Sequence, residues 1–368
     1  MKTTIMMLIV AILALTACTS HTESDLVKIG AAISLSGPAA AAGHSTQQAM
    51  DLAAREINAN GGINGRPLQI IYEDDNTDSK TATTAFTKLV TIDNVDAVIG
   101  GTWDFTYDSM APLAEQYKRT LITTQNPTMK GLTRNDYTVF MLPGLAPMTK
   151  SLSKYMQEKG IKRVAVVHFA SNWGNAVTEG MRDVMDETGG ELVLEETYTT
   201  IGGNDFGTIM QKIKKSEADA VFIDMVGSDV LNFLQRMRET NTNISVLSYE
   251  IVADFVGDPH VNQELLNGLV YFDFSILASD SFTKDYEKAY NEKPKHSADK
   301  AYDAVYVLAE ALMNVAPEDV PSYIEGRTFT TKNGQFTFRD LSVPSRVVYV
   351  QQIQDGKITT LETVTVTE

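Results

Sequence analysis

Short apolar runs alternate with amphipathic stretches along most of this chain. Residues 27–33 and 68–72 are apolar runs of a length typical of strands buried on both faces. Between them, apolar residues recur at helical spacing, at Ala49, Ala53 and Ile57. Ser45 and Gln48 have the spacing of a capping box, so we expect this helix to begin near Ser45. The stretch predicts a parallel strand–helix–strand unit. Its first loop should lie at the carboxyl edge of the sheet, where open α/β sheets bind ligands.

The same alternation continues through residue 249, with a restart after Pro143-Gly144. Further buried strands are expected at 95–99, 121–123, 139–142, 163–169, 191–198, 218–225, 244–249 and 269–274. Helices are expected at 79–92, 109–117, 147–159, 171–188, 206–216, 229–240, 281–291 and 298–315. Two successive runs of alternating strands and helices predict two α/β, Rossmann-like lobes. Residues 334–366 alternate at period two in places, which predicts antiparallel strands.

The first residues have the pattern of a secretion signal. Lys2 precedes an apolar run at 5–15, which is too short to form a stable membrane span. Leu15-Thr16-Ala17-Cys18 resembles a bacterial lipobox, and Cys18 is the only cysteine, so no disulfide can form within the chain. We expect residues 1–17 to be a lipoprotein signal peptide and Cys18 to be lipidated, although an incidental cysteine is the alternative. Residues 18–25 then form a tether that anchors the protein in the periplasm or on the outer face of the cytoplasmic membrane.

Composition and charge exclude several classes of partner. The chain has 368 residues, 43% of them hydrophobic, which is enough for two domains with substantial cores. Its net charge of −16 argues against nucleic-acid binding and against a polybasic membrane patch. We therefore expect a small-molecule ligand rather than a nucleic acid.

The motifs of catalytic and metal sites are missing from the sequence. There is no Gly-x-Ser-x-Gly elbow, no His-Glu-x-x-His and no Walker loop. The five histidines lack metal-ligand spacing, and we interpret His168, in an expected strand, as a structural residue. Residues 74–78 begin like a calcium loop, but Ser79 replaces the turn glycine and Ala85 replaces the bidentate glutamate. We expect no enzyme activity, no metal and no cofactor.

Several segments together resemble the Leu/Ile/Val-type periplasmic binding proteins, the solute receptors of ABC importers. The segments that carry the resemblance are Leu35-Ser36-Gly37-Pro38, Ala54 to Gly65, Tyr72-Glu73-Asp74-Asp75, Val98-Ile99-Gly100-Gly101 and Trp173-Gly174. The resemblance covers nearly the whole mature chain, and the lipobox fits the lipoprotein members of the family. It implies a type I periplasmic binding fold, in which two lobes close on a ligand by hinge bending.

The resemblance also implies three hinge crossings, near 142–147, 271–275 and 326–333. The N-terminal lobe is then expected to comprise 26–144 and 273–330. The C-terminal lobe is expected to comprise 145–272 and 331–368.

Candidate ligand contacts follow where this sequence matches the motifs of the family. In the first lobe they are Trp103, Asp104, Thr106, Thr124 and Gln125. Asp104 stands about where a serine is usual, and a second anion beside a ligand carboxylate is unfavourable, so a plain amino acid is a poor fit unless Thr106 takes that role. A helix N-cap is the alternative reading of Asp104, and ordinary turn chemistry is the alternative for Thr124 and Gln125.

In the second lobe the resemblance implies contacts from Trp173, Asp224 and Glu250. Trp173 matches an aromatic wall, and Glu250 matches the glutamate that pairs with a ligand ammonium. A solvated strand end is the alternative for Asp224, and Tyr249 and Tyr302 are weaker candidates.

The resemblance predicts a monomeric receptor that captures a small polar ligand and delivers it to the membrane subunits of an ABC permease. The carboxylates and aromatic residues of the expected cleft favour an amino acid, an amine, an amide or a related compound, with cation–π contacts to Trp103 or Trp173. The alternative function is a sensor subunit for a membrane signalling receptor, because the fold serves both roles. An exported enzyme using Asp104 and Glu250 is disfavoured, because nothing in the sequence orients them as an acid–base pair.

Overall fold

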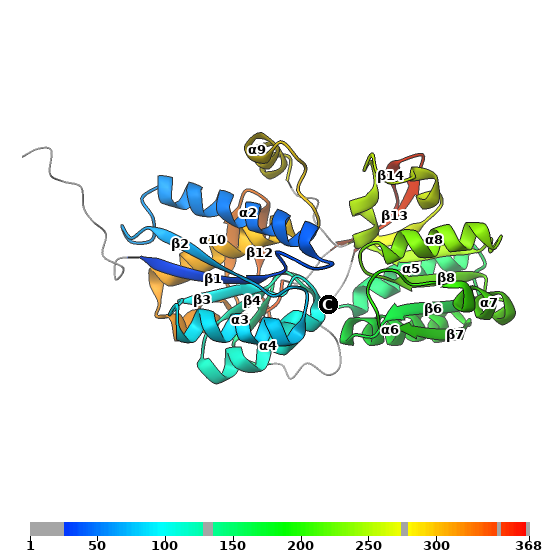
Figure 1. The fold of residues 1–368 in the computed structure, drawn as a ribbon, viewed down its shortest axis with the longest axis horizontal. Helices are drawn as coiled ribbons and strands as arrows, with labels where there is room; N and C mark the ends of the chain where they lie inside the picture. Colours follow the sequence, from blue (N-terminus) through cyan, green and yellow to red (C-terminus); the bar gives the residue numbers. More distant parts are fainter. Residues whose placement is uncertain (1–25, 128–134, 274–278, 344–346, 366–368) are drawn as a thin grey trace, which may run out of the picture.

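The computed structural model describes residues 26–127, 135–273, 279–343 and 347–365. The expected signal peptide, the lipidated Cys18 and the tether lie outside these residues. The described chain forms two α/β lobes that lie side by side (Figure 1). No helix in the described ranges combines the length and the apolar composition that crossing a membrane requires.

The first lobe is built on a five-stranded, fully parallel sheet. Its strands, in spatial order, are β2 (Leu68–Asp74), β1 (Val27–Ile33), β3 (Ala97–Gly100), β4 (Leu121–Thr123) and β5 (Thr138–Phe140). Four of these strands run through an apolar interior, as the continuous hydrophobic runs predicted. The parallel order brings the loops after β1, β3 and β4 to one edge of the sheet.

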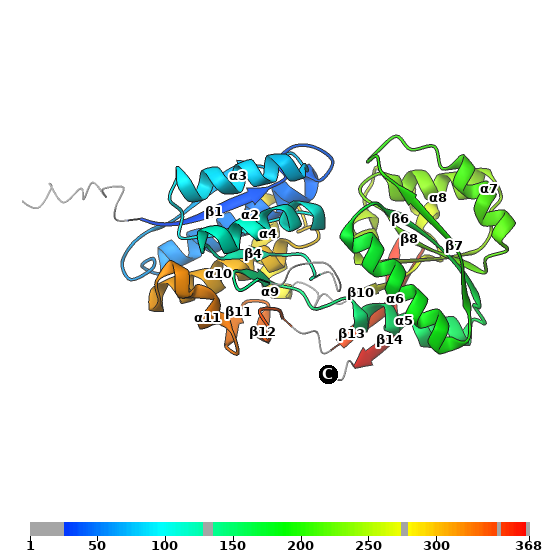
Figure 2. The same ribbon diagram turned by 90° about the horizontal axis from the view of Figure 1, so that it is seen from below.

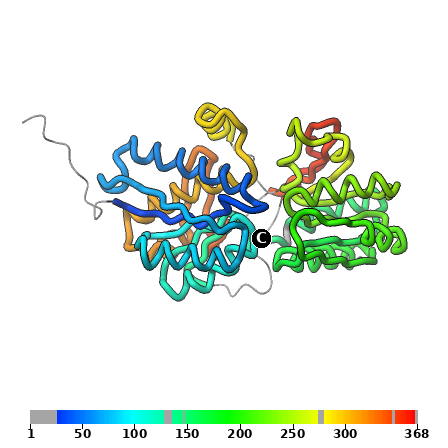
Figure 3. The backbone as a smooth tube through the Cα atoms, viewed as in Figure 1, coloured from blue at the N-terminus to red at the C-terminus, as the bar shows by residue number. Residues whose placement is uncertain are grey.

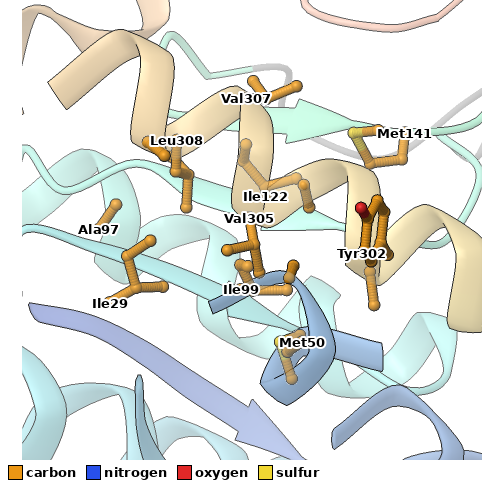
Figure 4. Close-up of a cluster of buried hydrophobic side chains, with 14 of the residues drawn as sticks. Ile29, Met50, Ala97, Ile99, Ile122, Met141, Tyr302, Val305, Val307 and Leu308 are labelled. Carbon is orange, nitrogen blue, oxygen red and sulfur yellow. The ribbon is translucent and has the colours of Figure 1, made fainter. Parts of the chain in front are cut away.

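Helices cover both faces of this sheet. One face carries α2 (Ala40–Ala59), α9 (Asp280–Tyr290), α10 (Ala298–Asn314) and α11 (Val320–Ile324). The other face carries α3 (Ser79–Thr91) and α4 (Asp104–Tyr117). Figure 4 shows Ile29 and Ile99 of the sheet together with Val305 of α10 in the core of this lobe. Helices far apart in sequence, α2 and α10, thus share one hydrophobic core.

Two helices begin earlier than the sequence predicted. α2 begins at Ala40, and the Ser45 hydroxyl hydrogen-bonds the Tyr286 hydroxyl at 2.8 Å instead of capping the helix. Alanine has the highest helix propensity of all residue types, and residues 39–42 are all alanine. The prediction that the helix begins only near Ser45 was therefore wrong. α4 begins at Asp104 rather than near 109, with the Thr106 hydroxyl donating to the Trp103 carbonyl oxygen at 2.7 Å.

The second lobe contains a seven-stranded mixed sheet. Its strands, in spatial order, are β14 (Lys357–Thr365), β13 (Val347–Gln354), β10 (Val270–Asp273), β9 (Ser245–Tyr249), β8 (Ala220–Asp224), β6 (Arg163–Phe169) and β7 (Glu191–Tyr198). β13 pairs antiparallel with β10 and with β14, which confirms the prediction from the period-two tail. The faces are covered by α5 (Ala146–Glu158) and α6 (Asn172–Thr188) on one side, and α7 (Gly207–Ser216) and α8 (Asp229–Glu239) on the other. Two 3₁₀ turns, Glu250–Phe255 and Gln263–Leu266, join β9 to β10.

Four successive stretches of the described chain lie alternately in the two lobes (Figure 3). The chain leaves the first core after Met141 and enters the second core at Leu142. It then leaves the second lobe after β10 and returns to the first lobe in α9.

The last change of lobe differs from the expected boundary after residue 330. The hairpin of β11 (Thr328–Thr331) and β12 (Gly334–Thr337) lies with the first lobe (Figure 2), and Phe338 is fully buried in the first core. The chain then runs beside β5, where the Phe140 N–H donates to the Leu341 carbonyl oxygen at 2.8 Å. Residues 331–343 therefore belong to the first lobe, because aromatic burial holds them there. The second lobe resumes at β13.

Candidate ligand-binding cleft

A cleft lies between the lobes, at the carboxyl ends of the strands of both sheets. Its walls in the first lobe are Trp103, Asp104, Gln125, Asn126 and His296. Its walls in the second lobe are Phe169, Ser171, Trp173, Asp224, Val226, Tyr249, Glu250 and Ile251. The cavity they enclose has a volume of about 40 Å³, so a ligand of amino-acid size requires the lobes to move apart.

Two of the expected contacts do not line this cleft. Thr106 is fully buried, and its hydroxyl is used at the start of α4, where it also accepts the Trp103 N–H at 3.4 Å. Thr124 follows β4 and is buried outside the cleft walls. The remaining six expected contact residues, in both lobes, do line it: Trp103, Asp104, Gln125, Trp173, Asp224 and Glu250.

Asp104 is the first residue of α4, and its carboxylate faces the other lobe. Its Oδ2 accepts the backbone N–H of Trp173 at 3.0 Å. Burial raises the pKa of Asp104, against hydrogen bonds from Trp173 and Ser171 that lower it. The carboxylate therefore already has a protein partner across the cleft.

Asp224 ends β8 at the floor of the cleft, with 2% of its surface exposed. Burial and the nearby Asp104 raise its pKa to about 8, despite hydrogen bonds from Tyr249 and the Phe169 N–H. Its Oδ2 is buried and has no hydrogen-bond partner. A buried oxygen without a partner costs free energy, so it marks a place where a ligand donor fits.

Glu250 begins the 3₁₀ turn after β9 and is likewise buried. Burial, followed by the repulsion of Asp273, raises its pKa well above the ordinary value. Its Oε1 lies 3.8 Å from Nε2 of His296, and its Oε2 has no hydrogen-bond partner. Two acceptor oxygens, one on Glu250 and one on Asp224, are thus available on the second lobe.

Aromatic rings form part of the second-lobe wall. The ring of Trp173 packs edge-to-face on Tyr249, with centroids 5.6 Å apart, and the Trp173 Nε1–H is buried without an acceptor. In the first-lobe wall, the side-chain amide of Gln125 donates one of its two N–H groups to the Thr102 carbonyl oxygen at 2.8 Å. Among the described residues, the buried side chains of the cleft walls thus offer one unused donor, on Trp173, and two unused acceptors, on Asp224 and Glu250.

The sequence reasoning missed part of the wall. Phe169 and Ser171 stand where β6 passes into α6, and the Ser171 hydroxyl accepts the Gly174 N–H at 3.1 Å as a helix N-cap. The only sequence pattern that points to these two residues is the succession of strand, loop and helix. That pattern occurs at every loop of the sheet edge, so it does not distinguish Phe169 and Ser171 from other loop residues. His296 comes from a segment between helices, and no local pattern places it in the cleft. Tyr249 lines the wall as the weaker prediction allowed, whereas Tyr302 lies in the first core.

The possible metal and catalytic groups have structural partners instead. The carboxylate of Asp74 accepts the N–H groups of Leu35, Ser36 and Asn76, which ties down the loop after β1. His168 is buried, and its ring nitrogens hydrogen-bond the Phe169 carbonyl oxygen and the Thr197 hydroxyl, which confirms its structural reading. In the described ranges, no group of three or more His, Cys, Asp or Glu side chains could hold a metal ion.

Residues 26–357 match the periplasmic binding protein family, and the chain belongs to this family. The Leu/Ile/Val-binding protein of Escherichia coli (strain K12) is 25% identical over 331 residues, which cover 85% of this chain and 86% of that protein. An amino acid binding protein of Pseudomonas aeruginosa is 28% identical over 237 residues, covering 62% of this chain and 61% of that protein.

Solved structures confirm the type I fold. The substrate-binding protein of a branched-chain amino acid transporter from Streptococcus pneumoniae, in complex with isoleucine, has a TM-score of 0.80 and 24% identity, covering 93% of this chain and 99% of that chain. A solute-binding protein of an ABC transporter from Rhodopseudomonas palustris, in complex with 3,4-dihydroxybenzoic acid, has a TM-score of 0.81 and 21% identity, covering 94% and 98%. The protein is therefore a periplasmic binding protein, a member of a family that lies outside the cytoplasmic membrane.

Proposed function

We propose that this protein captures a small polar ligand that carries an amine, an amide or another donor-rich group, and delivers it to an ABC permease. Amino acids and related compounds fall within this class. The observation that carries the proposal is the pair of buried carboxylate oxygens, on Asp224 and Glu250, that lack hydrogen-bond partners in the cleft. A ligand N–H at each oxygen removes the cost of leaving it unpaired.

The chemistry of the other walls supports the same ligand class. Trp173 and Tyr249 provide ring faces and edges on which a cationic or planar group can rest. The two solved structures are complexes with isoleucine and with 3,4-dihydroxybenzoic acid, and both compounds carry a carboxylate. Burial and repulsion from Asp104 already raise the pKa of Asp224, and an anionic ligand group would add to that repulsion, so a group that donates hydrogen bonds suits the cleft better.

A melting-temperature panel tests the proposal. The protein is heated with amines, amides, amino acids and aromatic acids, because a ligand that binds the folded state raises the melting temperature by mass action. We expect a donor-rich compound to raise it, and we expect Glu250→Gln and Asp224→Asn to remove that increase. Glu187→Gln is the matched control, because Glu187 lies on the outside of α6 with about half of its side chain exposed. A panel in which only anionic acids raised the melting temperature would contradict the proposal.

Delivery to a permease is tested by reconstitution. The receptor with its tightest ligand should stimulate the ATPase activity of the membrane subunits encoded beside it. If the ligand instead stimulated only a neighbouring membrane kinase or chemoreceptor, the sensor function would replace the importer function.

We also propose that the mature protein is a monomer held at the membrane by lipid on Cys18. The support for the lipid is the lipobox pattern Leu15-Thr16-Ala17-Cys18. The support for the monomer is that each lobe completes its own core within one chain. Incorporation of labelled palmitate that is lost in Cys18→Ala, and light scattering at the monomer mass, are the expected results.

A further inference from the structure

The two lobes touch directly where the first two turns of α4 meet the first turn of α6. Asp104 Oδ2 accepts the Trp173 N–H at 3.0 Å, and Asp108 Oδ2 accepts the side-chain amide of Asn172 at 2.8 Å. Residues four apart on a helix share one face, so the two carboxylates point at α6 together. We infer that these two hydrogen bonds, the α4–α6 latch, form an inter-lobe closure device whose residues position the cleft walls without help from a ligand.

The start of α6 explains why a carboxylate from the other lobe suits this place. The first N–H groups of a helix have no partner within the helix. The Ser171 hydroxyl satisfies the Gly174 N–H at 3.1 Å, and the Trp173 N–H is left to Asp104. The positive end of the helix dipole also favours an anion there. Asp104 therefore supplies from the first lobe what the second-lobe helix needs.

Apolar contacts across the boundary support the latch. The ring of Phe105, next to Asp104, lies 5.8 Å from the ring of Phe169 in the second lobe. Trp103 packs against the second-lobe core that α7 and α8 cover. Phe105, Phe169 and Trp103 thus lose contact with water when the lobes meet. The lower local dielectric strengthens the neighbouring hydrogen bond between Asp104 and Trp173.

The hydrogen bond between Asp108 and Asn172 allows the latch to be tested without altering a residue that can contact the ligand. Neither residue lines the cleft, whereas Asp104 does. Loss of the Asp108 hydrogen bond therefore changes how the lobes meet without changing any side chain of the cleft walls. A receptor that closes more readily binds its ligand more tightly. Because Asp108 is not a cleft wall, we expect it to affect ligand affinity only by changing how readily the lobes close.

Selective labelling of tryptophan gives a direct readout of the latch. The chain has two tryptophans, Trp103 and Trp173, so ¹⁵N-tryptophan labelling yields two backbone amide signals and two indole signals. Hydrogen–deuterium exchange of the Trp173 amide then reports whether Asp104 holds it. We expect slow exchange of this amide in the protein without added ligand, at neutral pH.

The variants test the latch as a unit. Asp104→Ala should speed exchange of the Trp173 amide by about tenfold or more, because its acceptor is gone. Asp108→Ala should speed it by severalfold although the acceptor stays. Asp108→Asn should restore slow exchange, because an amide oxygen still accepts from Asn172. Asn175→Ala, at an exposed position one turn further along α6, is the control and should change nothing.

Two results would overturn the latch. One is exchange of the Trp173 amide in the wild type as fast as in Asp104→Ala. The other is an Asp108→Ala variant with wild-type exchange, which would reduce Asp104 to a local cap. Small-angle X-ray scattering gives an independent check, since Asp108→Ala should increase the radius of gyration. The Trp173 indole signal reports on ligand separately, so failure of the proposed function leaves the latch result readable.

Discussion

At the scale of single residues, Gly43 decides how closely the first helix approaches the cleft edge. A β-carbon at this position would lie 1.8 Å from the carbonyl oxygen of Ser34. The loop holding Ser34 cannot retreat easily, because the Ser34 hydroxyl donates to Asp75 at 2.6 Å and the Leu35 N–H donates to Asp74 at 2.9 Å. The absence of a side chain at Gly43 therefore allows α2 to start directly beside the loop after β1.

This contact predicts the effect of Gly43→Ala. Alanine in a helix is normally more stable than glycine by about 1 kcal/mol. Here we expect a net loss of about 1–3 kcal/mol in the free energy of unfolding, because the backbone must shift to admit the methyl group. Urea unfolding measures the difference. Gly144→Ala is the control, since nothing lies within 4 Å of its β-carbon position. A Gly43→Ala protein as stable as the wild type would show that the loop yields freely.

At the scale of elements, the β11–β12 hairpin determines where the chain leaves the first lobe. Its two strands have four residues each, and an isolated two-stranded hairpin is only marginally stable in water. Phe329 and Phe338 pack edge-to-face, with centroids 5.6 Å apart, and both are buried in the first core. The hairpin is therefore part of the first lobe through its aromatic side chains.

Removal of one ring tests this assignment. We expect Phe338→Ala to lower the free energy of unfolding by about 3–5 kcal/mol, the usual cost of deleting a fully buried aromatic side chain. Phe336→Ala is the matched control and should cost less, because Phe336 is only partly buried. Both values come from chemical denaturation. Equal, small losses for the two variants would mean that the hairpin is not anchored in the first core.

At the scale of the whole molecule, closure of the lobes buries several carboxyl groups at one boundary. Burial and Asp104 raise the pKa of Asp224 to about 8. Burial raises the pKa of Asp108 to about 7, with Asp104 adding to the increase and Asn172 and Tyr107 opposing it. Asp104 and Glu250 also have raised pKa values, mainly through burial. We expect opening to expose these groups to water, which moves their pKa values back toward the ordinary range near 4.

The sign of the pH dependence follows from these directions. The closed form binds more protons than the open form, so its advantage is greatest at low pH and is lost as the pH rises through the raised pKa values. We expect the closed fraction without added ligand to fall between about pH 5 and pH 8. The radius of gyration from small-angle X-ray scattering measures it, and Asp108→Asn, which cannot titrate, should show a weaker trend. A radius of gyration that decreased toward pH 8 would contradict the conclusion that the closed form binds more protons than the open form.

The sequence by itself determined the class of protein and most of its elements. Continuous apolar runs such as 27–33 mark strands buried on both faces, and stripes such as the one ending at Ile57 mark covering helices. These signals are local, because each reflects the environment of a few neighbouring residues. Trp173, Asp224 and Glu250 were placed near the cleft by the family resemblance, and all three lie at or just after the carboxyl ends of strands of the second sheet.

Tertiary structure alone decided the hinge boundary and the role of Asp104. The Asp104 carboxylate finds its partner at Trp173, 69 residues away, and Phe338 is buried in the core that the first-lobe strands and helices build together. No local period encodes such pairings. His296 reaches the cleft for the same reason, because it lies between α9 and α10 and its backbone N–H donates to Asp254 of the other lobe at 3.0 Å. The loops at the sheet edge could thus be located from the sequence, whereas only the docking of two lobes shows which of their side chains meet each other and which are left for a ligand.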